Sequence, residues 1–270
     1  MGTLVCFHAH PDDEVMMTGG LMARASAEGH RVVLVIATNG EHGETPDDLA
    51  DGETLVDRRR KETERSAAVL GVDRLVCLGY SDSGMTGWTE NEHDGSFHQA
   101  DVHVAAEQLA EIARAENADV LTIYDWHGNY GHPDHIKVHQ VGVEAGRLVP
   151  SVRVLEATMN RDAFVAVIAA AKEAGVTMET PGDGEDEFDP HGPADDGNPM
   201  GTPQDELTLA IDVNAYSAKK REALRCHRSQ VSDTSLFMEM PDDAFAALFG
   251  TEWYIEHDAS PPMRSGWIFH

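Results

Sequence analysis

Two short segments, far apart in the chain, are crowded with side chains that can bind a metal ion. The first, HAHPDDE at residues 8–14, carries two imidazoles and three carboxyl groups. The second, HGNYGHPDH at residues 127–135, adds three imidazoles and one carboxyl group. Two neutral imidazoles and one carboxylate, with a position left for water, form a catalytic zinc site, and non-haem iron also uses this set. Together the segments indicate a metal-dependent enzyme.

Such a site suits hydrolysis. A bound metal lowers the pKa of its water and polarises a substrate carbonyl. A nearby carboxylate that does not bind the metal can take the water's proton, while a second imidazole stabilises the oxyanion or protonates a leaving amine. The two segments hold spare groups for both tasks. A non-catalytic metal-binding protein is the alternative from another class, and it has no need of a spare base and acid.

The choice of ligands in the second segment is open from spacing alone. Pro133 favours the first turn of a helix, which places His132 at the helix start and His135 about one turn in. His139 shares a helix face with His135 and is a rival ligand. Residues 10–13 taken alone also fit an ordinary helix start with acidic side chains in its first turn. Their pairing with the second segment favours the metal site.

The elements that must position these segments follow an alternating pattern. Short apolar runs rich in β-branched residues alternate with helical stretches, which predicts an α/β fold: a Rossmann-like, mostly parallel sheet with helices on both faces, in three layers. We expect strands at residues 4–7, 32–37, 75–78, 120–124, 152–157 and 207–213. We expect helices at residues 15–28, 57–70, 101–116, 134–148, 162–174 and 216–229. Ligands bind beyond the carboxyl ends of such strands, where both segments begin.

Residues 1–270 are expected to form a single domain. Long irregular segments at residues 39–56 and 79–100 each follow a strand, and loops of that length at this edge are usually functional. A third segment, at about residues 177–206, is rich in Gly, Pro and Asp and contains no Lys or Arg. We expect it to be an acidic insertion or a lid.

The composition excludes several classes of protein. The net charge of −28 repels phosphate backbones and anionic lipids, so we expect no nucleic-acid or membrane partner. No apolar run approaches the roughly 20 residues of a membrane-spanning helix, and we expect a cytoplasmic protein. The three cysteines are expected to be reduced core residues. The turn after the first strand lacks the Gly-x-Gly-x-x-Gly phosphate cradle, which argues against a dinucleotide-binding oxidoreductase.

Further short motifs accompany the two metal-binding segments. They include the Gly40-Glu41 turn, Arg59 three residues before Glu62, DSGM at residues 82–85 and HRSQ at residues 227–230. With AHPDDE at residues 9–14 and GHPDH at residues 131–135, the chain resembles the LmbE-like, or PIG-L, family of de-N-acetylases. This family includes deacetylases and amidases of mycothiol and bacillithiol metabolism. The paired His-Pro-Asp motifs are highly specific, and the others support them.

The resemblance implies a ligand set and a base. His10, Asp13 and His135 would bind Zn²⁺, with Fe²⁺ as the alternative metal, and Asp12 would be the general base. The rival ligand His139 has no place in this set. The implied cofactor is the metal ion alone.

The resemblance also implies roles for other residues. His132 would stabilise the oxyanion or act as general acid, and Tyr130 would approach the polarised carbonyl. Met17 stands where amidases of mycothiol conjugates tend to carry Lys, which argues against that subclass. The implied substrate contacts are Arg59, Asp82, Met85 and Glu41.

The sequence therefore predicts a zinc-dependent hydrolase that removes an acetyl group from an N-acetylglucosaminyl-type conjugate. An amide in a thiol conjugate or an acylated natural product is the alternative substrate. The expected partner is a small molecule, and assembly into a homo-oligomer is left open, because members of the resembled family assemble differently.

Overall fold

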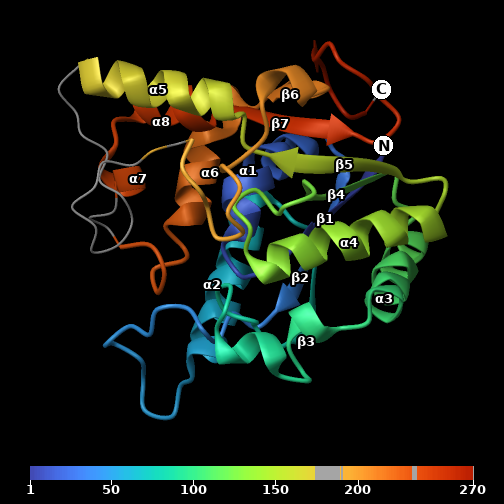
Figure 1. The fold of residues 1–270 in the computed structure, drawn as a ribbon, viewed down its shortest axis with the longest axis vertical. Helices are drawn as coiled ribbons and strands as arrows, with labels where there is room; N and C mark the ends of the chain where they lie inside the picture. Colours follow the sequence, from blue (N-terminus) through green and yellow to red (C-terminus); the bar gives the residue numbers. More distant parts are fainter. Residues whose placement is uncertain (174–188, 190, 233–235, 270) are drawn as a thin grey trace.

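One eight-stranded sheet runs through the protein, as the computed structural model in Figure 1 shows. The structure describes residues 1–173, 189, 191–232 and 236–269. The strand order is β3-β2-β1-β4-β5-β7-β6-β8. The strands are β1 Thr3–His8, β2 Arg31–Thr38, β3 Arg74–Tyr80, β4 Val120–Tyr124, β5 Arg153–Thr158, β6 Leu209–Asp212, β7 Thr251–Glu256 and β8 Arg264–Ser265.

Helices cover both faces of the sheet (Figure 1). Because side chains alternate along a strand, Cys6 of β1 joins an apolar cluster with α1, α2 and α6, whereas Val5 and Phe7 join another with α3 and α4. The three-layer α/β prediction is confirmed. The helices are α1 Asp13–Ala27, α2 Leu55–Leu70, α3 Val102–Ala115, α4 Pro133–Leu148, α5 Arg161–Glu173, α6 Ser217–Leu224, α7 Leu236–Glu239 and α8 Asp242–Phe249.

The strand predictions hold best in the first half of the chain. The five expected strands before residue 158 are β1 to β5, and they run parallel. The sixth is the shorter β6, which is separated from β5 by β7. β7 was not among the predicted strands, and it pairs antiparallel with both neighbours. Its run TEWYIE follows Gly250 and is rich in aromatic and β-branched residues, which is a strand signal.

Two further predictions need correction. The helix expected at residues 216–229 ends at Leu224, because His227 turns back and donates its N–H to the Leu224 carbonyl at 3.1 Å. Cys77 is exposed rather than in the core, because β3 is an edge strand with a partly exposed surface. All three cysteines are free thiols. None of the described helices combines the length and apolar character needed to cross a membrane.

Helix α2 begins and ends at clear local signals. Thr54 accepts the Asp57 N–H and donates its own N–H to the Asp57 carboxylate, which forms a capping box. Gly71 ends the helix in the left-handed conformation, with φ of 77°. The helix packs against α1. Its buried polar side chains are Arg59, Glu62, Thr63 and Ser66.

Part of the expected acidic insertion packs against the loop that follows β4. Residues 177–188 and 190 lie outside the described residues. In the described remainder, Asp195 donates its N–H to the Tyr130 carbonyl at 2.9 Å, and Gly201 donates to the Asn129 carbonyl at 2.7 Å. An added Cβ at Gly131 would lie 2.4 Å from the Asp196 nitrogen, so this close approach requires glycine. Residues 191–206 therefore support the loop that carries the second metal-binding segment.

Candidate active site

The two chemically rich segments meet because β1 and β4 are neighbours in the sheet. The strands pair in parallel with Leu4 opposite Val120 and Cys6 opposite Thr122, so their carboxyl ends share one edge. α1 begins inside the first segment, at Asp13, and α4 begins inside the second, at Pro133. This edge collects the imidazole rings of His10, His132 and His135, which are all buried.

One carboxylate oxygen links two of these histidines. Asp13 Oδ2 lies 3.2 Å from Nδ1 of His10 and 3.2 Å from Nε2 of His135. Two ligand atoms on a tetrahedral zinc ion, each about 2.0–2.1 Å from the metal, lie roughly 3.3 Å apart. The spacing between Asp13 and each histidine therefore fits zinc.

The outer hydrogen bonds of the two rings decide which nitrogen is free. His10 Nε2 lies 3.2 Å from Asp134 Oδ2 and 3.5 Å from Asp82 Oδ1, so this nitrogen carries the proton. His135 Nδ1 lies 3.1 Å from the Gly128 carbonyl, which can only accept a hydrogen bond. With a metal bound, each ring would offer its other nitrogen, next to Asp13, as a ligand.

Distance alone also groups other donor atoms within 4.8 Å of one another. These groups are His10, His132 and His135, and His10, Asp82, His132 and Asp134. Hydrogen bonding argues against both as ligand sets. His132 Nδ1 accepts the Asp134 N–H at 3.1 Å, so the neutral ring carries its proton on Nε2. Asp134 accepts from the Ser83 N–H and hydroxyl as well as from His10, and it acts as an outer partner that orients His10.

The rival ligand His139 is directed elsewhere. Its Nδ1 lies 3.1 Å from the Tyr124 carbonyl and 3.7 Å from a Glu156 carboxylate oxygen. Neither His139 nor Asp13 belongs to the two clusters of close donor atoms in the described part of the chain, so the hydrogen bonds of the His139 ring are what argue against it as a ligand.

Asp12 is placed beside the ligands but has a different partner. Its carboxylate accepts a hydrogen bond from Arg59 Nη2 at 3.1 Å, and a quarter of its side chain is exposed. Burial raises the pKa of Asp12 to about 6, and the nearby Asp13 charge adds to this, while Arg59 opposes it. A carboxylate with a pKa near the working pH suits a general base.

Two hydrogen-bond donors face the same region. His132 is the N-cap of α4, and burial together with the nearby His10 and His135 lowers its pKa to about 3. The hydroxyl of Tyr130 lies 3.4 Å from His135 Nε2. Burial holds the pKa of Tyr130 well above its usual value, so the phenol keeps its proton. Both groups are neutral donors at pH 7.

The predicted substrate contacts divide into two groups. Arg59 is buried, and its guanidinium donates to the carbonyls of Pro11 at 2.5 Å and Gly40 at 2.7 Å. Asp82 is also engaged, because it accepts the Gly84 N–H at 2.9 Å and faces His10. These two residues hold the loops of the site together.

Met85 and Glu41 have groups left to offer. The Met85 side chain is exposed. Glu41 has one buried carboxylate oxygen with no hydrogen-bond partner among the described residues. An unpaired buried acceptor is costly, so this oxygen is suited to accept a hydroxyl of a ligand.

Sequence reasoning missed several residues that support the site. Asp134 and Ser83 belong to quoted motifs, so their positions were a usable signal for an outer layer of hydrogen bonds. Asp196, whose carboxylate lies 3.5 Å from His127 Nδ1, comes from the acidic segment and carried no such signal.

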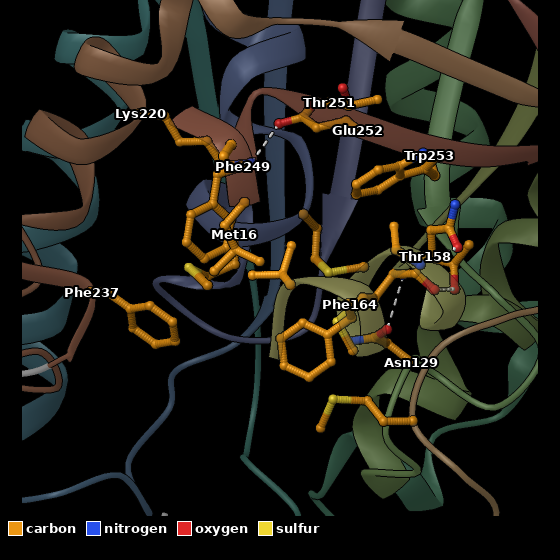
Figure 2. A pocket seen from close by; sticks show the side chains of 18 residues that line it. Met16, Asn129, Thr158, Phe164, Lys220, Phe237, Phe249, Thr251, Glu252 and Trp253 are labelled. Atoms are coloured by element: carbon orange, nitrogen blue, oxygen red, sulfur yellow. Dashed lines mark hydrogen bonds and ion pairs between the residues drawn. The ribbon is translucent and has the colours of Figure 1, made fainter. Parts of the chain in front are cut away.

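An apolar cavity of about 330 Å³ adjoins the start of α1 (Figure 2). Met16 and Met17 of α1, Asn129 of the second segment and Phe164 of α5 contribute to its wall. Figure 2 shows Phe237 at the left of this space and Asn129 at its right, and Phe249 also lines the cavity. The cavity thus shares α1 and the loop after β4 with the candidate site.

Comparisons with known proteins agree with this arrangement. The family model described as GlcNAc-PI de-N-acetylase, PIG-L, matches residues 5–146. The chain is 38% identical over 267 residues to a 1D-myo-inositol 2-acetamido-2-deoxy-alpha-D-glucopyranoside deacetylase of Acidothermus cellulolyticus, covering 94% of this chain and 88% of that one. It is 39% identical over 275 residues to the protein of the same description from Thermobifida fusca, covering 97% and 94%.

Solved structures share the fold. An N,N'-diacetylchitobiose deacetylase from Pyrococcus horikoshii matches with a TM-score of 0.58 and 22% identity, covering 94% of this chain and 83% of that one. A teicoplanin deacetylase matches with a TM-score of 0.57 and 18% identity, covering 96% and 100%.

Proposed function

Since the chain belongs to the GlcNAc-PI de-N-acetylase family and is therefore a hydrolase of amide bonds, we propose that it removes the acetyl group from an N-acetylglucosaminyl-inositol conjugate. The observation that carries this proposal is the Asp13 oxygen 3.2 Å from both His10 Nδ1 and His135 Nε2, with the Asp12 carboxylate bound to Arg59 beside them. The two relatives described above are named for this substrate and match over nearly their whole length.

The proposed metal ligands are His10 through Nδ1, Asp13, and His135 through Nε2. A zinc ion held there supplies a water of lowered pKa and polarises the amide carbonyl. The same ligand types also suit Fe²⁺, so zinc is the proposed rather than the required metal.

Asp12 and His132 would complete the chemistry. Asp12 takes the proton of the attacking water and then delivers it to the leaving amine. The hydrogen bond from the Asp134 N–H to His132 Nδ1 supports the oxyanion role for His132, because the neutral ring presents an Nε2–H donor. Tyr130, whose hydroxyl keeps its proton, adds a second donor toward the carbonyl oxygen.

Substrate recognition would use the exposed rim of the site. Glu41 offers its unpaired carboxylate oxygen to a sugar hydroxyl, and Met85 offers apolar contact. Arg59 and Asp82 would act mainly by holding the Asp12 loop and His10, because both Nη atoms of Arg59 and the Asp82 carboxylate are already engaged.

An acylated natural product is the second candidate substrate, and the apolar cavity favours it. A GlcNAc-inositol conjugate is polar throughout and has no group that fills about 330 Å³ of apolar space. Met17 lines this cavity at the position where thiol-conjugate amidases tend to carry Lys. Because its side chain is uncharged, it offers no charged group to a polar conjugate.

The remaining proposals concern the setting of the reaction. We propose that residues 1–270 act as one domain in the cytoplasm on a small-molecule substrate, without a nucleic-acid or membrane partner. All described strands join one sheet, and the net charge of −28 supports the absence of anionic partners. Assembly into a homo-oligomer is compatible with this proposal, and light scattering measures it directly.

A comparison of acyl groups separates the two candidate substrates. The zinc-loaded protein is assayed for free-amine release from the GlcNAc-inositol conjugate, from free N-acetylglucosamine and from an N-octanoyl glucosamine. The proposal expects the highest kcat/KM for the inositol conjugate. Preference for the octanoyl amide, lost when Met17→Lys places a charge in the cavity, would instead support the acylated natural product. Asp12→Asn should abolish release from every substrate.

A further inference from the structure

Asp12 has an unusual backbone conformation for a residue with a side chain. Its φ is 105° and its ψ is −31°, in a region that residues other than glycine rarely adopt. The residue directly precedes α1, and its side chain makes no cap for that helix. Such a conformation persists only where surrounding contacts hold it.

A buried glutamate supplies one of these contacts. Glu14 folds back over the start of α1, and its Oε2 accepts the Asp12 N–H at 2.8 Å. Its other oxygen, Oε1, accepts from His227 Nε2 at 2.7 Å and from the Ser66 hydroxyl at 2.6 Å. The side chains of Glu14, Ser66 and His227 are all inaccessible to solvent. Glu14 therefore joins α2 and the turn after α6 to the backbone of Asp12.

Among the described residues, the His227 ring makes one hydrogen bond, to Glu14, and its charge lowers the pKa of Asp12. Its Nδ1 is buried without a hydrogen-bond partner among the described residues, so the bond from Nε2 to Glu14 orients the ring. The turn that carries His227 is already tied to α2 by a second pair. Glu62 accepts the Ser229 N–H at 3.0 Å and the Ser229 hydroxyl at 2.5 Å. The turn is thus held to α2 by Glu62 as well as to Glu14 by His227.

We propose that Glu14 and His227 are positioning residues that fix the Asp12 carboxylate through its own backbone. Arg59 Nη2 lies 3.1 Å from this carboxylate. Glu14, which is itself bonded to His227, accepts the backbone N–H of Asp12. The inference rests on the proposed role of Asp12 as the general base. A catalytic group displaced by about 1 Å can lose roughly 100-fold in rate.

The neighbouring Glu62 makes a matched control possible. Glu14→Met removes the acceptor for the Asp12 N–H at nearly constant volume, and Glu62→Met removes a buried glutamate of the same kind that does not contact Asp12. Glu14→Gln keeps an acceptor, because the Ser66 hydroxyl and the His227 ring can both reverse their hydrogen bonds. A positioning role predicts that Gln rescues activity, whereas a role for the negative charge predicts that it does not.

The experiment measures kcat, KM and zinc content for the three variants, and amide hydrogen exchange of the peptide that contains Asp12. We expect Glu14→Met to lower kcat by about 10- to 100-fold, with KM and zinc content unchanged, and to speed exchange at Asp12. Glu14→Gln and Glu62→Met should stay within about threefold of wild-type kcat. Should Glu14→Met fail to fold, His227→Leu takes its place, with the same direction of effect.

Two results would overturn the inference. One is wild-type kcat and exchange in Glu14→Met, and the other is an equal loss of kcat in Glu62→Met. If the wild-type protein releases no acetate from the conjugate, the proposed function fails instead. The exchange measurement still decides whether Glu14 holds the Asp12 backbone, so the two failures are distinguishable.

Discussion

Three histidines at one sheet edge differ because each uses its second ring nitrogen differently. His10 Nε2 faces carboxylates and His135 Nδ1 faces a carbonyl, so the other nitrogen of each ring is the one available to a metal. His132 uses Nδ1 to accept a backbone N–H and is left with a donor. In the proposed mechanism, identical side chains would therefore take the roles of ligand and oxyanion donor through their outer partners.

Substitution of single histidines separates these roles. His135→Gln should bind zinc at least about 10-fold more weakly, because the ligand nitrogen is lost. His132→Gln should keep stoichiometric zinc and lose about 100- to 1,000-fold in kcat, because an oxyanion donor is displaced. Metal analysis after dialysis, together with kcat, checks both. Zinc loss in His132→Gln would mean that the three-histidine cluster is the ligand set.

The pH dependence follows from Asp12. Burial raises the pKa of Asp12 to about 6, and a base works only when it is deprotonated. kcat/KM should therefore be constant above about pH 7 and fall tenfold per unit well below pH 6. A pH profile of the zinc-loaded enzyme measures this, with zinc content followed in parallel so that metal loss is recognised. A profile that stays flat down to pH 4.5 would show that the pKa of Asp12 is not raised in the zinc-loaded enzyme.

At the scale of single residues, the sequence predicted the candidate residues within each motif. It did not predict the hydrogen bonds that join one motif to another. His10, Asp13 and His135 stand out because ligand types are clustered within a few positions. The hydrogen bond between Glu14 and His227 joins residues 213 positions apart in the chain, and no local sequence pattern predicts it. The protonated nitrogen of each ring likewise depends on tertiary contacts.

At the level of elements, turns with tight glycines place the ligands. Gly128 has φ of 65°, and its carbonyl orients His135 at 3.1 Å. An added Cβ at Gly128 would lie 2.3 Å from the His135 Cβ and 2.8 Å from the Ile136 nitrogen. The loop after β4 and the start of α4 are therefore packed as closely as their backbones allow.

Gly128→Ala should displace His135 and weaken zinc binding by at least about 10-fold. Gly29→Ala is the matched control, because Gly29 also has a positive φ, of 81°, but its added Cβ meets nothing within 4 Å. Zinc affinity by competition with a chelating dye compares the two variants. Equal affinities in both would show that the close packing at Gly128 is not needed for the site.

Elements were predictable where one local pattern decided them. The apolar runs of β1, β2, β4 and β5 are buried along their length, and they stand out in the sequence. The end of α6 was not predictable, because the turn after Leu224 is fixed by Glu62 and Glu14 of other helices. β7 carries a strand signal in its own run TEWYIE and could have been predicted, whereas its place between β5 and β6 depends on the pairing of the whole sheet.

At the scale of the whole molecule, one sheet connects β1 and β4, which precede the two segments of the candidate site, to the carboxyl-terminal strands. β5 pairs with β7, and Glu252 of β7 accepts the N–H groups of Gly20 and Leu21 in α1. The carboxyl-terminal part of the chain is thus bonded directly to the helix that follows Asp12.

Unfolding should therefore occur in one cooperative transition that zinc shifts upward. A ligand that binds only the folded state adds RT ln(1 + [L]/Kd), which is about 2.7 kcal/mol at 100 times Kd. Calorimetry of the zinc-loaded and EDTA-treated protein measures the shift, and Asp47→Asn, at an exposed position, serves as a control that should behave like wild type. Two separate transitions would contradict the single-domain proposal, and an unchanged Tm would contradict a site that binds zinc.

The most direct test of the central claim is acetate release from the GlcNAc-inositol conjugate, followed by proton NMR with zinc-loaded protein. Free acetate and free primary amine should appear in equal amounts, stop after EDTA treatment and resume when zinc is restored. If the zinc-loaded protein leaves the conjugate intact, the chain is not a deacetylase of this substrate. If acetate release continues unchanged after complete metal removal, the metal-dependent mechanism is wrong.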